Sequence, residues 1–314
     1  MPETTNPPLQ VRQYLLITFN YWAFTLTDGA LRMLIVLYFH QLGYSPLEIA
    51  FLFLFYEFFG IVTNLVGGWL GARVGLNRTM HLGIGLQVLA LGMLLVPDAW
   101  LTVLWVMSAQ ALSGIAKDLN KMSAKSAVKF MVRPGDSGRL YKLVAVLTGS
   151  KNTLKGLGFF LGGVLLSGLG FQGSMLAMML GLSFIGAISL VLLEKELGKA
   201  SGKLPFRQLL SKSQPVNILS AARFFLFGAR DVWFVVALPV HLATAFYWRH
   251  EQVGAFLALW IIAYGGVQAL APRLTGQASS SPPDGYTATV WALPLALMPL
   301  FMACSPGAVN FRGP

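Results

Sequence analysis

The sequence predicts an all-α polytopic membrane protein, and three observations support this fold class. Of the 314 residues, 55% are hydrophobic and 11% are charged, whereas a soluble domain has about 25% charged residues. The apolar stretches are long enough to cross the hydrocarbon core as helices. They do not show the ten-residue alternation of a membrane barrel strand. The lipid bilayer is therefore the expected surrounding of most of the chain.

Nine stretches have the length of a membrane span. In chain order they cover approximately residues 15–39, 47–71, 79–97, 99–116, 141–168, 172–193, 216–245, 251–271 and 287–304. The leading MPETTNPPLQVRQ has neither the basic region nor the cleavage site of a signal peptide, so the first span is expected to remain as an anchor. The single Cys304 excludes a disulfide framework.

The basic residues predict the orientation of the spans. A net charge of +11 in a soluble chain would suggest a nucleic-acid partner. Sixteen of the 23 basic residues, however, lie in or beside alternate loops, and the opposite loops contain only Arg249. This positive-inside pattern places the N-terminus in the cytoplasm. The charge is therefore explained by topology, and no nucleic-acid partner is expected.

A polar connection separates two groups of spans. Residues 194–215, EKELGKASGKLPFRQLLSKSQP, contain five basic residues and two prolines and read as a cytoplasmic linker. We therefore expect an N-terminal six-helix transmembrane bundle over 1–193 and a partial C-terminal bundle of about three helices over 216–314. The ending SPGAVNFRGP has no apolar periodicity, which suggests that three helices have been lost by fragmentation or a frameshift.

The two groups resemble each other. An offset of 203 residues pairs Asp28 with Asp231 and Glu48 with Glu251. Parallel six-helix halves are the major facilitator architecture. The segment GWLGARVGLNR (68–78) also resembles the loop G-x-L-x-D-x-x-G-x-x-[RK] of that superfamily, although Gly71 stands in place of its acid; a plain basic loop with glycines at helix ends is the alternative. The residues of this predicted conformational loop are Gly68, Arg73, Gly75 and Arg78.

Glycines in the fifth span permit two interpretations. Gly149, Gly158, Gly162 and Gly163 resemble the glycine pattern of the fifth helix in exporters and antiporters, without the proline of that pattern. Small residues at this spacing are also found where helices merely pack closely.

Charged residues inside the spans are functional candidates, because a charge at the centre of a membrane helix costs about 2.5 to 3.5 kcal/mol on insertion scales. The fourth span ends in lysines spaced by four, of which Lys125 and Lys129 read as a solvated face. The deep cations outnumber the deep acids, which predicts an anionic substrate bound by guanidinium and ammonium groups. The predicted substrate-binding residues are Arg32, Lys117, Lys121, Lys151, Lys155, Arg223 and Arg230. The predicted coupling or ion-pair residues are Asp28, Glu57, Asp118 and Asp231.

Two expectations concern how these charges meet. Asp28 and Arg32 lie four residues apart on one helix face, so the acid should offset the guanidinium until substrate arrives. Four lysines, Lys117, Lys121, Lys151 and Lys155, should face one shared cavity rather than lipid. The alternative is that the charges only hold helices together.

The sequence contains no motif that supports a soluble enzyme. The segment GKASGKL (198–204) has the wrong glycine spacing for a phosphate-binding loop, and the four histidines have no metal-ligand spacing. We expect neither an enzyme nor a metal or other cofactor. Transport should be driven by a gradient, with Asp28, Glu57 or Asp231 as the candidate proton carrier.

Five polar segments resemble the ArsJ-type organoarsenical efflux permeases. The resemblance runs from about residue 10 to 273 and implies a major facilitator exporter in the bacterial inner membrane. It implies export of 1-arseno-3-phosphoglycerate, arsenate resistance, and a functional link to the glyceraldehyde-3-phosphate dehydrogenase that makes this ester. The alternatives are a carrier of another organophosphate or drug, and a truncated membrane protein that does not transport. The segments are TFNYWAFTLTDGALRML (18–34), FHQLGYSPLEIAFLFLFYEFFGIVTNLVGGWLGARVGLNR (39–78), SGIAKDLNKMSAKSAVK (113–129), LTGSKNTLKG (147–156) and SAARFFLFGARDVWFV (220–235).

Overall fold

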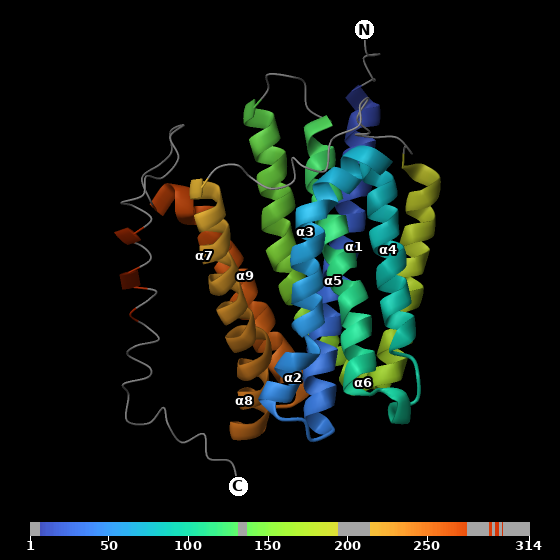
Figure 1. The fold of residues 1–314 in the computed structure, drawn as a ribbon, viewed down its shortest axis with the longest axis vertical. Helices are drawn as coiled ribbons and strands as arrows, with labels where there is room; N and C mark the ends of the chain where they lie inside the picture. Colours follow the sequence, from blue (N-terminus) through green and yellow to red (C-terminus); the bar gives the residue numbers. More distant parts are fainter. Residues whose placement is uncertain are drawn as a thin grey trace. The chain divides into compact units, whose positions relative to one another are not determined.

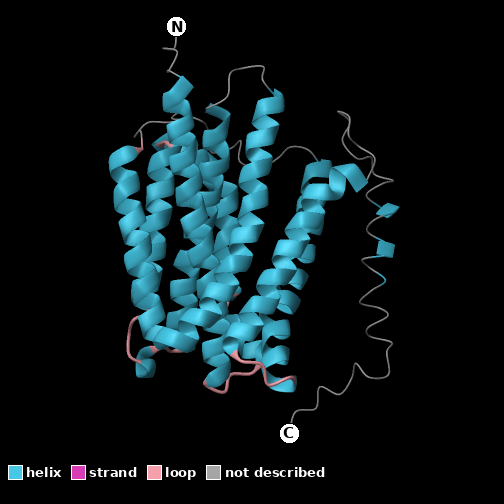
Figure 2. Cartoon of the chain, turned by 180° about the vertical axis from the view of Figure 1, so that it is seen from behind, coloured by secondary structure: helices cyan, strands magenta, loops and turns pink. Residues whose placement is uncertain are grey.

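The computed structural model describes residues 7–130, 137–193, 214–274, 289–290, 293–294 and 297. These residues form helices joined by short loops, and none of them lies in a strand (Figure 2). The chain forms two compact units, Met1–Gly265 and Gly266–Pro314, and the packing described below is that of the first. The predicted all-α fold is confirmed.

The helices follow the predicted spans in order, and α1 to α6 run side by side (Figure 1). Their bounds are α1 Pro7–Gln41, α2 Pro46–Leu52, α3 Leu54–Val74, α4 Leu76–Met93, η1 Asp98–Trp100, α5 Val103–Phe130, α6 Ser137–Leu192, α7 Gln214–Asp231, η3 Val232–Ala237, α8 Leu238–Ala245 and α9 His250–Leu274. The predicted linker and most of the predicted ninth span lie outside the described residues. The predicted division into bundles and linker therefore stays a prediction.

Three spans differ from single straight helices. The second is interrupted at Phe53, between α2 and α3. The fifth and sixth are joined as α6, which bends at Gly170, where φ is 67° and only glycine is unstrained. The seventh changes from α7 to the π-helix η3 and back to α8. Pro239 at the start of α8 lacks a backbone donor, which accounts for a widened turn just before it.

Within the described residues, three segments are long and apolar enough to cross a membrane: Arg12–Gln41, Pro46–Asn64 and Leu147–Leu192. The last has 46 residues, enough for the two crossings that the bend at Gly170 separates. In the most apolar stretch of Arg12–Gln41, which belongs to α1, 72% of the residues are buried. The corresponding share is 28% in Pro46–Asn64 and in Leu147–Leu192. α1 is therefore the central helix of the first unit.

The turn into α2 is specified locally. The Ser45 hydroxyl accepts a hydrogen bond from the Glu48 backbone N–H at 3.4 Å, and the Glu48 carboxylate accepts one from the Ser45 N–H at 2.8 Å. Pro46 occupies the first helical position, where a missing N–H costs nothing. This capping box fixes where the second span begins.

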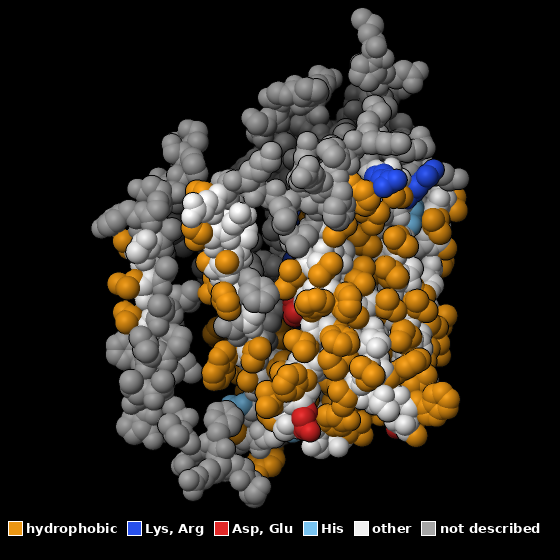
Figure 3. All heavy atoms as spheres, in the orientation of Figure 1, with side chains coloured by type: hydrophobic (Ala, Val, Ile, Leu, Met, Phe, Trp, Pro, Cys, Tyr) orange, Lys and Arg blue, Asp and Glu red, His pale blue; other side chains and the backbone are white. Residues whose placement is uncertain are grey.

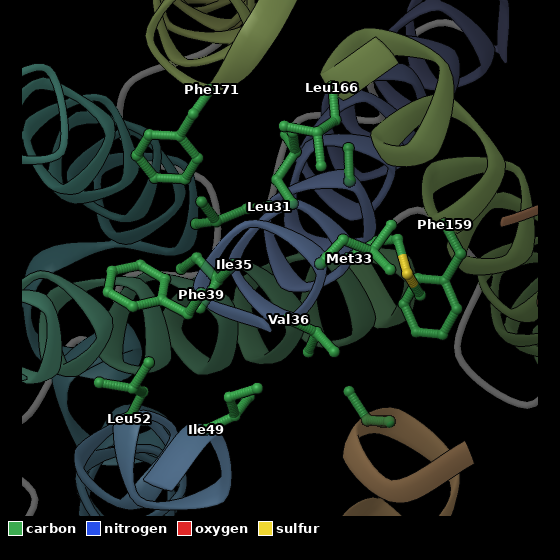
Figure 4. Packing of buried hydrophobic residues seen from close by; sticks show 14 of the residues in the cluster. Leu31, Met33, Ile35, Val36, Phe39, Ile49, Leu52, Phe159, Leu166 and Phe171 are labelled. Atoms are coloured by element: carbon green, nitrogen blue, oxygen red, sulfur yellow. The ribbon is translucent and has the colours of Figure 1, made fainter. Parts of the chain in front are cut away.

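The main hydrophobic core surrounds α1. Leu31, Ile35 and Phe39 of α1 are fully buried or nearly so, and they pack with residues of α2 and α6 (Figure 4). α1 makes its most extensive contact with α6, while α3 and α4 pack on α5. On the outer face that Figure 3 shows, hydrophobic side chains cover α3 and α4, and the prominent Lys and Arg side chains lie at one end. Such a surface suits lipid along its length and water at its end.

Glycines bring α6 against two neighbours at backbone distance. A Cβ atom on Gly158 would lie 2.5 Å from the Leu26 carbonyl oxygen of α1. On Gly163 it would lie 2.5 Å from the His250 carbonyl oxygen of α9. On Gly149 it would meet nothing within 4 Å. Close packing thus accounts for Gly158 and Gly163, and likewise for Gly162, whose Cβ would lie 2.6 Å from an α1 carbonyl oxygen.

Candidate functional site

Arg32 of α1 forms an ion pair with Glu57 of α3. The distance from Arg32 Nη2 to Glu57 Oε1 is 2.7 Å. The Arg32 side chain is 4% exposed and the Glu57 side chain is 41% exposed. A buried guanidinium is thus neutralised by an acid that lies nearer the surface, as burial of a charge requires.

Asp28 has a different partner from the one that the sequence predicts. Its carboxylate accepts a 2.7 Å hydrogen bond from the Tyr56 hydroxyl, and the ion pair recorded for Arg32 is with Glu57. Two consecutive residues of α3, Tyr56 and Glu57, therefore engage Asp28 and Arg32 of α1. The prediction of an Asp28–Arg32 pair is wrong because these interactions across the helix interface take the place of the contact along one helix.

Lys117 of α5 completes the cluster around Tyr56. Its Nζ lies 3.9 Å from Glu57 Oε2 and 4.0 Å from Asp118 Oδ2. The same Nζ lies 4.0 Å from the centre of the Tyr56 ring, and Arg32 Cζ lies 4.1 Å from it. Both cations are thus held at cation–π distance by one buried aromatic ring.

Asp118 is the single acidic residue of α5, and it is tightly paired. It is 4% exposed, and its Oδ1 accepts from Lys121 Nζ at 2.6 Å. A Cβ on Gly60 of α3 would lie 2.9 Å from Asp118 Oδ2. The missing side chain at Gly60 is therefore what lets this carboxylate approach α3. We call Asp28, Arg32, Tyr56, Glu57, Lys117, Asp118 and Lys121 the charge network.

The lysines of α6 lie beside this network. The charges of Lys155, Lys121, Lys117 and Lys125 all act on Lys151, whose side chain is partly buried. Lys155 Nζ lies 5.6 Å from the centre of its neighbouring Phe159 ring. The structure thus brings the predicted basic residues of α5 and α6 into one electrostatic neighbourhood, Lys125 included. Their facing a common cavity stays a prediction.

Two buried tyrosines at the network, Tyr21 and Tyr56, were not predicted from the sequence. The Tyr21 hydroxyl is within electrostatic range of both Asp118 and Asp28. It has no hydrogen-bond partner among the described atoms, and neither has the amide of Asn120. Tyr56 could have been noticed, since FLFLFYEFFG places one hydroxyl beside a deep acid. Tyr21 carries no such signal, because its burial depends on how the helices pack, whereas Asn120 stands between two predicted site residues, Asp118 and Lys121.

Several predicted residues are only partly described. The backbones of Arg223, Arg230 and Asp231 belong to α7, but their side chains lie outside the described part of the structure, so their roles stay predictions. The side chain of Lys129 and the surroundings of Gly68 likewise lie outside the described part of the structure. In the rest of the predicted loop, Gly75 ends α3 with φ 104° and donates its N–H to the Gly71 carbonyl at 2.9 Å. Arg73 and Arg78 are exposed, and Arg73 Cζ lies 5.2 Å from the centre of the Trp69 ring.

A second polar contact joins α1 and α6 to α9. Gln41 Nε2 lies 3.0 Å from His250 Nε2, and the Ser167 hydroxyl donates to Glu251 at 2.8 Å. Partial burial lowers the pKa of His250 below its ordinary value, against the opposing influence of Glu251. Within the described ranges, no group of three or more His, Cys, Asp or Glu side chains could hold a metal ion.

Comparison with known proteins agrees with this helical fold. A model of the Major Facilitator Superfamily matches residues 15–310, while no curated protein matches the sequence. A POT family transporter solved in complex with 5-aminolevulinic acid is similar, with a TM-score of 0.63 and 14% identity over 86% of this chain and 72% of that chain. A structure that addresses substrate recognition in proton dependent oligopeptide transporters has a TM-score of 0.61 and 16% identity, over 97% and 77% of the two chains.

A third similar structure is a bacterial homologue of the human drug peptide transporters PepT1 and PepT2. Its TM-score is 0.51 and its identity 17%, over 85% of this chain and 57% of that chain. The chain thus spans between 57% and 77% of the length of these three transporters. At such identities the likeness shows the fold alone. The family model, which covers most of the sequence, shows that the chain belongs to the Major Facilitator Superfamily, a superfamily of multi-pass membrane transporters.

Proposed function

We propose that the protein exports an anionic organoarsenical, 1-arseno-3-phosphoglycerate, from the bacterial cytoplasm by alternating access. One observation carries this proposal: the charge network is built from the segments that resemble the organoarsenical permeases. Segment 18–34 supplies Asp28 and Arg32, segment 39–78 supplies Tyr56 and Glu57, and segment 113–129 supplies the lysines and acid of α5.

The charge balance of the site supports an anionic substrate. Within the described side chains, the network together with Lys151 and Lys155 contains five basic and three acidic residues. Like charges held in one neighbourhood repel unless an anion lies among them. A substrate with a phosphate and an arsenate group would supply that anion, and both groups suit the planar fork of Arg32.

Export is proposed to depend on a partner enzyme and on a gradient. The glyceraldehyde-3-phosphate dehydrogenase would make the ester from arsenate, and the ester would hydrolyse after release outside the cell. Asp28, Glu57 or Asp231 is the proposed proton carrier, which would make the protein an antiporter in the inner membrane. Arsenic uptake into inverted vesicles should then follow an imposed pH gradient, and uptake that ignores the gradient would refute this coupling.

The decisive experiment is growth on arsenate. An arsenate-sensitive bacterium without its own arsenic exporters would express the 314-residue chain with or without the dehydrogenase. We expect protection only when both are present. Protection without the dehydrogenase would exclude the ester as substrate. Absence of protection, with the protein correctly inserted, would favour a carrier of another organophosphate or drug, or a protein that does not transport.

A further inference from the structure

The carboxylate of Glu57 bridges two cations that lie on different helices, Arg32 of α1 and Lys117 of α5. Glu57 Oε1 lies 2.7 Å from the Arg32 guanidinium, and Oε2 lies 3.9 Å from the Lys117 ammonium. We propose that Arg32 and Lys117 form the oxyanion subsite of the transporter, and that Glu57 occupies it in the empty carrier until a phosphate or arsenate group of the substrate displaces it. This inference rests on the proposed function and assigns a subsite within it.

The geometry around Glu57 is that of an anion held by two donors. Each of its oxygens faces a different cation, as two oxygens of a bound phosphate would. The distance to Arg32 is a short charge-assisted hydrogen bond, whereas the distance to Lys117 exceeds hydrogen-bond length. A tetrahedral oxyanion is larger than a carboxylate, so it can satisfy both donors at once. The present occupant therefore fits the pair less well than the proposed substrate group.

The surroundings hold the two cations in place. Arg32 Cζ and Lys117 Nζ lie 4.1 and 4.0 Å from the centre of the Tyr56 ring, and Tyr56 is fully buried. The hydroxyl of that ring is fixed by Asp28. The distance between the cations is thus set by a rigid group rather than by Glu57. Removal of the Glu57 carboxylate should leave a preformed site, which lowers the cost of binding another anion.

Glu57 is the acid best placed to leave. Its side chain is 41% exposed, so packing leaves it more room to change rotamer than the other two acids have. Asp28 and Asp118 are 7% and 4% exposed, and each is held by a short hydrogen bond, from Tyr56 and Lys121 respectively. Displacing either of those would leave a carboxylate buried without its donor, which is costly. Among the acids of the described network, Glu57 thus combines the greatest exposure with a bridge between cations of two different helices.

The test measures binding of 3-phosphoglycerate, a stable compound with the phosphate end of the proposed substrate, to the purified full chain by calorimetry. Glu57→Gln removes the competing charge and keeps the size of the side chain, so we expect its affinity to rise about tenfold or more over the wild type. Glu48→Gln makes the same change at the exposed start of the span and should bind like the wild type. Glycerol, which lacks both the phosphate and the carboxylate, should bind equally weakly to all three.

A second set of variants tests the cations and guards against misfolding. Arg32→Ala and Lys117→Ala should each lose about tenfold or more in affinity for 3-phosphoglycerate. Glu57→Asp keeps the charge but shortens its reach, so it should bind more tightly than the wild type even if Glu57→Gln does not fold. Each protein would first be checked by gel filtration and circular dichroism.

The outcomes separate this inference from the proposed function. Equal affinity of the wild type and both folded Glu57 variants would overturn displacement, and unchanged affinity of both cation variants would overturn the subsite. Absence of binding to the wild type and to the Glu57 variants would overturn the inference as well. Tighter binding by Glu57→Gln together with no arsenate protection in cells would support the subsite and refute organoarsenical export.

Discussion

The hydroxyl of Tyr56 donates a 2.7 Å hydrogen bond to Asp28, and both residues are buried. This bond links α3 to the central helix α1 through a group that has no access to solvent. The ring of the same tyrosine contacts two cations. Tyr56 therefore has two separable roles, one through its hydroxyl and one through its ring, and a single substitution can distinguish them.

Tyr56→Phe should destabilise the protein without removing its cation contacts. The Asp28 carboxylate loses its donor in a buried place, and an unsatisfied polar group there costs about 1 to 3 kcal/mol. We expect a lower thermal unfolding midpoint in detergent by several degrees. Tyr247→Phe serves as control, because Tyr247 is 87% exposed and its midpoint should not change. An unchanged midpoint for Tyr56→Phe would mean that water replaces the hydroxyl at no cost.

Arg32 should not be replaceable by lysine. Arg32→Ala, and Arg230→Ala on the symmetry-related span, are expected to abolish arsenate protection. Arg32→Lys keeps the charge but loses the bidentate fork, so it should restore protection only in part. Growth curves at several arsenate concentrations, normalised to the amount of inserted protein, measure this. Full protection by a stably inserted Arg32→Ala protein would show that the residue is only structural.

The glycines of α6 should differ sharply in their tolerance of one methyl group. Gly158→Ala would place a Cβ 2.5 Å from a backbone oxygen of α1, so the helices must separate, and we expect a loss of about 1 to 3 kcal/mol as for other overpacked sites. Gly149→Ala meets nothing within 4 Å and should be neutral or stabilising, since alanine favours helix. Chemical or thermal unfolding of both variants in the same detergent tests the contrast. Equal stabilities would contradict the close α1–α6 packing.

The contact between α1 and α9 should weaken in acid. Burial lowers the pKa of His250, so the folded contact binds fewer protons than the separated form. Its stabilisation is then present above the ordinary histidine pKa of about 6.5 and is lost as the pH falls below that value. Protonation would also remove the ring acceptor that faces the Gln41 amide. The nearby charged or titratable groups are His40, Arg249 and Glu251, of which Glu251 opposes the shift.

This pH response can be followed by spin labels. Labels at Leu42 and Tyr247, in a chain with Cys304 replaced by serine, would report the separation of α1 from the turn before α9. We expect the separation to increase between pH 7.5 and pH 5, as estimated from that ordinary histidine pKa of about 6.5. His250→Gln stays neutral throughout and should abolish the response. A response that persists in His250→Gln would assign it to another group.

The sequence predicted the helices well and the contacts between them poorly. Apolar length is a local property, and it placed the break between the predicted spans 141–168 and 172–193 where the structure bends, at Gly170. The partner of Arg32 was missed because it lies 25 residues away on another helix, while periodicity reports only neighbours on the same helix. The interruption at Phe53 was missed for a related reason. It has no proline or glycine to mark it.

The glycines of α6 that contact α1 and α9 affect how easily these helices can move past one another. Gly158 faces α1 and Gly163 faces α9, so this helix presents smooth surfaces to two neighbours. Interlocked side chains must change rotamers before helices can slide, and that resists motion. Glycine contacts remove this resistance. We therefore expect that α9 can tilt against α6 while the contact between α6 and α1 is kept. The same contacts leave no room for a larger side chain. A methyl group added at Gly163 should therefore hinder the movement of α9 against α6.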